Sequence, residues 1–156
     1  MKRLGMIILA AALTVGGATA GASAGEFDWQ IKVRQGMMTL RAWNISTLGA
    51  MAKGKMEYDA GAAQTAADNL VALSRMSSGA MWPKGSDSTA FPGKTNAKVE
   101  TWTTYPAVAD IDKAHIAAAA RMAEVAGNGL DAVQAEIGNL GGSCGGCHKK
   151  FREKKE

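Results

Sequence analysis

Apolar residues recur along the chain at a spacing close to 3.6, which predicts helices separated by polar turns. The pattern gives four helical segments, at residues 27–53, 59–76, 95–125 and 130–154. No segment shows the alternation of apolar and polar residues that is typical of a strand. The sequence therefore predicts an all-α fold, an antiparallel four-helix bundle.

Residue types that cap or end helices stand near the expected boundaries. The expected N-caps are Asp28, Asp59 and Thr95 or Asn96. Gly54 is an expected stop, and Pro106 should either kink the third helix or mark a restart. Residues 77–95 are rich in Gly, Pro, Ser and Asp, which predicts a long loop. Its apolar residues, expected to point inward, are Met81, Trp82 and Phe91.

The first 24 residues have the three parts of a secretory signal peptide. Lys2 and Arg3 form the positive end, residues 6–15 form the apolar stretch, and Ala22-Ser23-Ala24 matches the small-residue cleavage pattern. The apolar stretch is short for a membrane-spanning helix. We therefore expect cleavage after Ala24, a mature single domain of residues 25–156 in the periplasm, and no stable membrane insertion.

The formal charge of +4 falls to +2 when Lys2 and Arg3 are removed. Much of the positive excess lies near the C-terminus, at Lys149, Lys150, Arg152, Lys154 and Lys155. Such a tail is typical of a solvated helix end, which the helix dipole favours. Docking of an acidic redox partner is the alternative. The small net charge and the lack of a nucleic-acid-binding motif argue against nucleic acid as a partner.

The strongest chemical signal is the stretch Cys144-Gly-Gly-Cys147-His148-Lys-Lys-Phe-Arg-Glu153. The spacing Cys-x-x-Cys-His is typical of covalent haem c attachment. Each thiol can add to one haem vinyl group, and the His that follows can bind the iron through a neutral imidazole nitrogen. Gly145 and Gly146 allow the porphyrin edge to approach closely. We expect one covalently attached haem c with its iron.

Other uses of paired cysteines fit less well. A structural zinc site needs four ligands, and since the chain has two Cys and two His, His115 would have to complete it. A thioredoxin-like pair should follow a strand in a βαβ unit, which the pattern does not show. A disulfide is the remaining alternative. We expect His115 to be a surface or core residue.

With this motif at its C-terminal end, the chain resembles the class II cytochromes c, the family of cytochrome c′ and its low-spin relatives of the c-556 type. Class I cytochromes c carry the motif near the N-terminus instead. The other segments that resemble this family are Arg34-Gln35-Gly36-Met37-Met38-Thr39-Leu40, residues 48–54 with Tyr58-Asp59, and residues 82–87 with Trp102. The family fold is an antiparallel four-helix bundle, which agrees with the helical pattern.

The resemblance implies roles for individual residues. Cys144 and Cys147 correspond to the thioether cysteines, and His148 corresponds to the proximal iron ligand. Arg152 corresponds to a basic residue near that His. The resemblance also places at the haem or its propionates Arg34, Gln35, Ser86 and Asp87.

The expected function depends on Met38. It stands where c-556 proteins carry a methionine that binds iron, and where cytochromes c′ carry an apolar residue that shields the open iron face. A thioether opposite His148 would give six-coordinate, low-spin iron that suits electron transfer. Without it, the iron would be five-coordinate and could bind nitric oxide or carbon monoxide. Simple core packing is the third interpretation, because the chain has nine Met.

We expect a periplasmic electron carrier with His148 and Met38 as iron ligands, which exchanges electrons with redox partner proteins and transforms no substrate. The alternative is a gas-binding cytochrome c′. A haem enzyme such as a peroxidase would want an acid–base group close to the iron, and none stands beside Met38. Because the family often forms homodimers through the first two helices, a homodimer is a further expectation.

Overall fold

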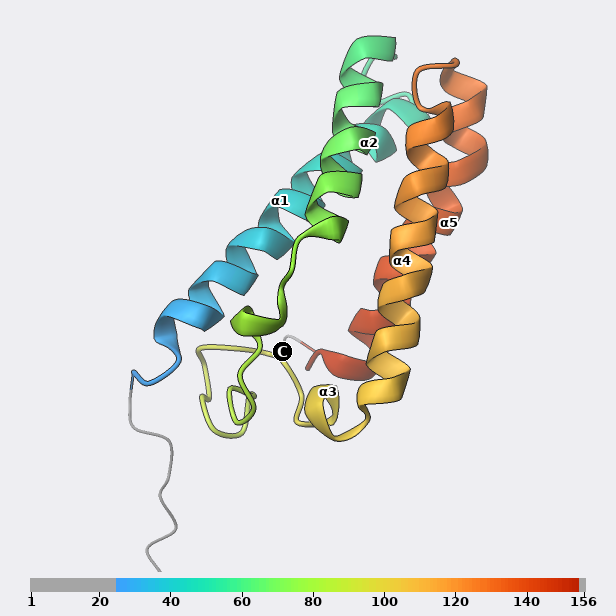
Figure 1. The fold of residues 1–156 in the computed structure, drawn as a ribbon. Helices are drawn as coiled ribbons and strands as arrows, with labels where there is room; N and C mark the ends of the chain where they lie inside the picture. Colours follow the sequence, from blue (N-terminus) through green and yellow to red (C-terminus); the bar gives the residue numbers. More distant parts are fainter. Residues whose placement is uncertain (1–24, 155–156) are drawn as a thin grey trace, which may run out of the picture.

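The computed structural model describes residues 25–154. Within them, four long helices pack as an antiparallel bundle (Figure 1), namely α1 (Asp28–Ala52), α2 (Ala60–Arg75), α4 (Tyr105–Val125) and α5 (Leu130–Phe151). A 3₁₀ turn (Gly79–Met81) and the short α3 (Glu100–Thr103) lie in the connection between α2 and α4. The predicted all-α four-helix bundle is confirmed. The predicted signal peptide, residues 1–24, lies outside the described residues.

The boundaries of the first two helices follow from their end residues. Asp59 caps α2 as predicted, because its Oδ1 accepts the N–H of Ala62 at 2.6 Å. Gly54 follows α1 with φ +65°, a backbone region that favours glycine. The prediction for Asp28 is wrong, since Phe27 occupies the N-cap position and Asp28 lies in the first turn.

The third long helix begins later than predicted. α4 starts at Tyr105 with Pro106 in its first turn. N–H groups in a first turn have no partner within the helix, so the missing proline N–H costs no helical hydrogen bond. Pro106 therefore marks a restart. Thr95 and Asn96 are not caps of this helix, because they lie in the long connection before α3.

Residues 96–98 instead pair in extended form with the end of the chain. Lys98 N–H donates to the Phe151 carbonyl at 2.9 Å, and Glu153 N–H donates to the Asn96 carbonyl at 2.8 Å. The backbone becomes extended directly after Phe151, so α5 ends three residues before its predicted limit of 154. Local helix propensity cannot reveal such a long-range pairing.

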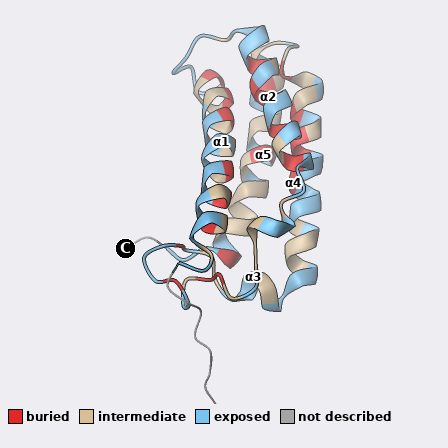
Figure 2. Ribbon diagram, turned by 60° about the vertical axis from the view of Figure 1, so that its left-hand side comes forward, coloured by how far each residue is buried: buried red, intermediate tan, exposed pale blue. Residues whose placement is uncertain are grey.

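The apolar core occupies one end of the bundle. The inner helix faces carry the buried positions, and the outer faces are exposed (Figure 2). The largest fully buried side chains of the core are Leu48, Met51, Leu70, Met122, Val133 and Leu140. These come from the last part of α1, the middle of α2, the last part of α4 and the first half of α5. The Cys-x-x-Cys-His segment lies beyond this core, toward the other end of the bundle.

No helix among residues 25–154 combines the length and the apolar character that crossing a bilayer requires.

Candidate haem site

Cys144, Cys147 and His148 lie on one face of α5. The spacings of three and four residues bring side chains to the same side of a helix. All three residues are half-buried, and the two thiols are free. The helix also continues without a break through the glycines around the motif. The geometry thus presents two thiols and one imidazole to a single space.

Burial shifts the pKa values of His148 and Cys147. Burial lowers the pKa of the His148 imidazole, and the positive charge of Arg152 lowers it further. His148 is therefore neutral at pH 7, which is the form that binds a metal. Burial raises the pKa of the Cys147 thiol, with Asp112 and Cys144 adding to the effect.

One hydrogen bond between α5 and α1 gives a register in which Met38 corresponds to His148. Gln134 of α5 donates from Nε2 to the carbonyl of Ala52 at the end of α1, at 2.9 Å. Antiparallel helices advance about 1.5 Å per residue in opposite directions. The fourteen residues from Gln134 to His148 along α5 therefore correspond to fourteen residues back from Ala52, which leads to Met38. Met38 is half-buried, whereas its neighbour Met37 is fully buried.

Arg34, one helical turn before Met38, holds the loop that follows α2. Its guanidinium donates to both Oγ and the carbonyl of Ser86 at 2.6 Å, and to Thr95 Oγ1 at 2.8 Å. The side chain is 2% exposed. Burial lowers its pKa to about 10, with Asp87 opposing the shift. Arg34 is therefore still charged at pH 7.

Two tryptophans complete this contact. The Trp82 and Trp102 rings lie 4.7 Å and 5.8 Å from the Arg34 guanidinium carbon, within the range of cation–π attraction. Trp102 Nε1 donates to the Trp82 carbonyl at 2.9 Å. Phe91, predicted like Trp82 to point inward, is buried and its ring packs against that of Phe27.

The other loop residues expected at the haem also make internal contacts. Asp87 Oδ1 accepts the N–H groups of Thr89 and Ala90, and Ser86 Oγ donates to the Pro83 carbonyl. Both Ser86 and Asp87 are buried. Their side chains therefore shape the loop, and contact with a haem propionate remains a prediction for them.

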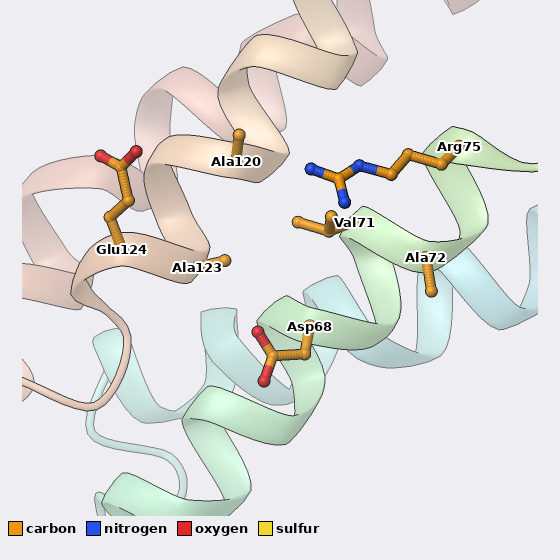
Figure 3. Close-up of a pocket in the computed structure, with 7 residues that line it drawn as sticks. All are labelled: Asp68, Val71, Ala72, Arg75, Ala120, Ala123 and Glu124. Carbon is orange, nitrogen blue, oxygen red and sulfur yellow. The ribbon is translucent and has the colours of Figure 1, made fainter.

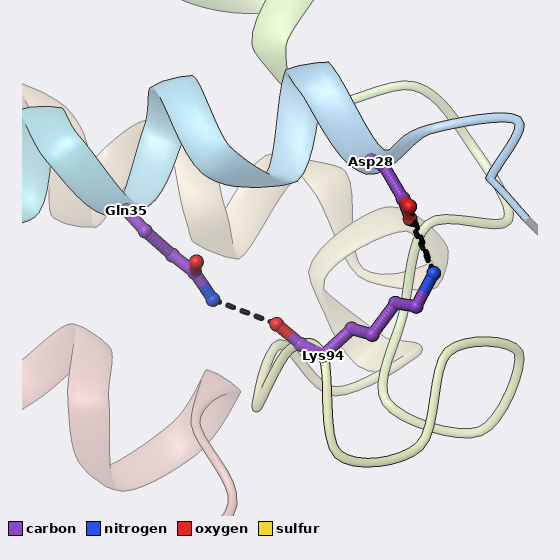
Figure 4. Close-up of polar contacts among 3 residues, drawn as sticks. All are labelled: Asp28, Gln35 and Lys94. Atoms are coloured by element: carbon purple, nitrogen blue, oxygen red, sulfur yellow. Dashed lines mark hydrogen bonds and ion pairs between the residues drawn. The ribbon is translucent and has the colours of Figure 1, made fainter.

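Gln35 and Asp28 tie the same loop to α1 through Lys94 (Figure 4). Gln35 Nε2 donates to the Lys94 carbonyl at 2.8 Å, and Lys94 Nζ lies 2.7 Å from Asp28 Oδ1. These contacts are exposed, so each contributes little to stability. We define the loop joint as Arg34 and Gln35 together with Ser86, Lys94 and Thr95.

The structure thus divides the predicted site residues into two groups. Cys144, Cys147 and His148 face the space opposite Met38, with Arg152 directly after α5 close enough to affect His148. Arg34, Gln35, Ser86 and Asp87 belong to the loop and its attachment to α1.

His115 is a buried neighbour of the attachment site whose position the sequence did not reveal. It is 6% exposed on α4, and its Nδ1 lies 3.0 Å from Ser143 Oγ and 3.9 Å from Cys144 Sγ. Burial lowers the pKa of His115, as does the charge of Arg41. Of the two predicted places for His115, the surface and the core, the core is confirmed. The contact joins α4 to α5, so no local sequence signal points to it.

Around the motif, α5 leaves open space on its surface. An added Cβ at Gly141, Gly142, Gly145 or Gly146 would meet no atom within 4 Å, so this part of α5 faces open space. The apolar core does not reach this end of the bundle. Among residues 25–154, no three His, Cys, Asp or Glu side chains gather where they could hold a bare metal ion. Two thiols and a neutral imidazole beside such a space suit covalent haem c.

A groove on the surface of the bundle lies elsewhere. It runs between α2 and α4, has a volume of about 490 Å³, and is lined by Asp68, Val71, Ala72, Arg75, Ala120, Ala123 and Glu124 (Figure 3). None of these residues belongs to the Cys-x-x-Cys-His segment, and the charged ones suit contact with water. We therefore assign the haem to the space beside the motif on α5.

Two relatives with similar sequences are cytochromes of Cereibacter sphaeroides. A cytochrome c′ of that organism is 33% identical over 155 residues, which cover 99% of this chain and all of the relative. A cytochrome c-554 is 36% identical over 135 residues, which cover 83% of this chain and 96% of the relative. The similarity therefore spans the whole described bundle.

Solved structures show the same fold. A cytochrome c′ described as from "Rhodobacter Spheriodes" matches with a TM-score of 0.80 and 32% identity, covering 83% of this chain and 98% of the relative. A ferrous variant of cytochrome c prime from Alcaligenes xylosoxidans with bound NO matches with a TM-score of 0.70 and 25% identity, covering 85% and 99%.

The family model for Cytochrome C' matches residues 29–152, which include all four long helices almost completely. Its members bind one covalently attached haem c, and the residues that this requires are present and face one space on α5. The chain is a c-type haem protein and belongs to the cytochrome c′ family.

Proposed function

We propose that this protein binds a diatomic gas, nitric oxide or carbon monoxide, at the haem iron on the face opposite His148. The proposal rests on which helices contain residues that bind haem iron strongly. Both histidines of the chain, His115 and His148, come from α4 and α5. Neither α1 nor α2 contains a His or Cys, so the opposite face lacks a strong protein ligand.

Met38 then acts as a shield of the open iron face. A ferrous haem iron with a free coordination position binds nitric oxide and carbon monoxide. Met38 is half-buried at the level of His148, where its flexible side chain can cover the position and yield to a small ligand. The NO-bound relative of known structure supports this function.

Electron transfer with Met38 as the sixth ligand is the second candidate. The helix register that brings Met38 opposite His148 favours it, because a thioether and a histidine are an established pair of axial ligands in c-type cytochromes. In that case the protein exchanges electrons with redox partner proteins. Both proposals place the mature chain in the periplasm, consistent with the signal-peptide pattern of residues 1–24. Neither includes turnover of a substrate.

Absorption and EPR spectra of the ferric and ferrous protein, with and without carbon monoxide, separate the two candidates. We expect high-spin ferric iron and a carbon monoxide complex on reduction. In Met38→Ala, carbon monoxide should bind faster because the shield is gone, while Met37→Ala should leave the rate nearly unchanged. Low-spin ferric iron with no carbon monoxide complex would refute gas binding, and a sulfur-to-iron charge-transfer band lost in Met38→Ala would establish the electron carrier.

We further propose that a second copy of the chain docks on the exposed face of α1. Trp29, Leu40 and Trp43 are 70%, 54% and 72% exposed, and they fall within one face of the helix. Leu40 also lines a groove of about 310 Å³ between α1 and α2. A relative of known structure is described as having ligand-controlled dimer dissociation.

Sedimentation velocity tests this arrangement. Trp43→Ser should shift the protein toward monomer, whereas Tyr105→Ser, which removes an equally exposed ring from α4, should not. If both variants and the unmodified protein show the same proportion of dimer, this face is not the interface.

A further inference from the structure

Arg41 of α1 carries a buried hydrogen-bond donor that no group in the described part of the chain accepts. Its Nη2 donates to the carbonyl of Leu73 near the end of α2, at 3.1 Å. Its Nε is buried and has no hydrogen-bond partner among residues 25–154. Buried donors are almost always paired, because losing contact with water is costly. The unpaired N–H is therefore available to a bound ligand.

The position of Arg41 places it next to the haem. It follows Met38 by three residues, so both lie on the same side of α1, one turn apart. The antiparallel register that pairs Met38 with His148 pairs Arg41 with Gly145, between the two attachment cysteines. The charge of Arg41 also acts on Cys147 and on His115, which belong to α5 and α4. The guanidinium thus faces the space between the two helix pairs.

Arg41 would lie on the far side of an attached haem from the proximal ligand. His148 projects from α5, whereas Arg41 projects from α1 and is held by α2. A haem attached to α5 therefore separates His148 from Arg41. The guanidinium is on the side where an external ligand enters, and its Nε–H is free to donate there.

We propose that Arg41 makes the distal side of this haem selective for small anionic ligands of ferric iron, of which azide is the probe. This inference rests on the proposed open iron face. A fixed positive charge and an N–H donor in a site of low dielectric stabilise an anion much more than a neutral diatomic. Carbon monoxide on ferrous iron gains little from either, so the two ligands report on different properties of the site.

The test compares Arg41, Arg41→Lys and Arg41→Met in the haem-loaded protein, each in a Met38→Ala background. That background opens the distal position whether Met38 shields or ligates. The azide Kd of the ferric protein should rise at least about tenfold in Arg41→Met, the effect of losing one charged hydrogen bond. Arg41→Lys should give a smaller rise. The carbon monoxide affinity of the ferrous form should stay within about twofold in all three.

A matched charge control is available at the end of α2. Arg75 is exposed, and Arg75→Met removes the same formal charge from a side chain in contact with solvent. It should leave the azide Kd unchanged. The reduction potential gives a second readout, because loss of the Arg41 charge favours ferric iron and should lower the potential in Arg41→Met but not in Arg75→Met.

The outcomes separate this inference from the proposed function. An unchanged azide Kd in Arg41→Met, or equal losses of azide and carbon monoxide affinity, would refute the role of Arg41. A lack of carbon monoxide binding by the protein with Met38 intact would instead refute gas binding, and the Met38→Ala series would still measure the effect of Arg41. Far-UV circular dichroism of each variant shows that the bundle is retained.

Discussion

Replacing Arg34 by Met tests whether the loop joint is a main determinant of stability. Arg34 is the one charged residue of the joint that is almost fully buried, and it donates three hydrogen bonds to Ser86 and Thr95. Met has a similar length and no charge. The substitution therefore removes the bonds while still filling most of the space.

The expected loss follows from two opposing contributions. Hydrogen bonds from a charged donor contribute about 1.5–3 kcal/mol each, so three contribute about 4.5 to 9 kcal/mol. Burial opposes them, since it lowers the pKa of Arg34 to about 10. At about 1.4 kcal/mol per pKa unit, this opposes the charged form by about 3 kcal/mol. We expect Arg34→Met to lower the free energy of unfolding by about 3 kcal/mol.

Urea denaturation of the haem-loaded protein at pH 7, followed by circular dichroism, measures this loss. Gln35→Ala is the control, because it removes one exposed hydrogen bond from the adjacent residue and should cost less than about 1 kcal/mol. An Arg34→Met variant as stable as Gln35→Ala would refute the reasoning. If Arg34 also contacts the haem, as the family resemblance implies, the variant should in addition change the reduction potential.

Two further changes test other buried polar contacts. Tyr58→Phe should lower the free energy of unfolding by about 1–3 kcal/mol, because the hydroxyl donates to the Ala126 carbonyl and accepts the Gly129 N–H; urea denaturation measures it. His115→Gln should flatten the loss of stability in acid. The folded pKa of His115 is lowered, so its contribution is complete above about pH 6.5 and is lost as the pH falls through and below that value. Urea midpoints at pH 7.5 and 5 should differ less in the variant, and an equal difference would contradict the predicted role of His115.

The sequence predicted the helices and the attachment motif because their signals are local. The Asp59 cap, the Gly54 stop and the helical spacing of apolar residues each depend on neighbours within a few positions. The Cys-x-x-Cys-His motif is likewise contained in one helical turn and the next. Such features are readable from one sequence without tertiary contacts.

Most of the features that the sequence missed join distant segments. Residues 96–98, which the sequence assigned to a helix, pair instead with residues 151–153. The place of His115 beside Cys144 depends on the packing of α4 against α5. The unpaired donor of Arg41 becomes visible only once α1 and α2 are positioned.

The uneven core explains why a chain with few aromatic residues forms this bundle. The main apolar cluster closes the end that contains Leu48, Met122 and Leu140, whereas the other end has the loop joint, a few buried rings such as Phe91, and the pairing of residues 96–98 with the segment after α5. A haem attached to Cys144 and Cys147 supplies at that end the apolar surface that side chains supply elsewhere. Because a group that binds the folded chain also stabilises it, haem attachment and folding of this end depend on each other.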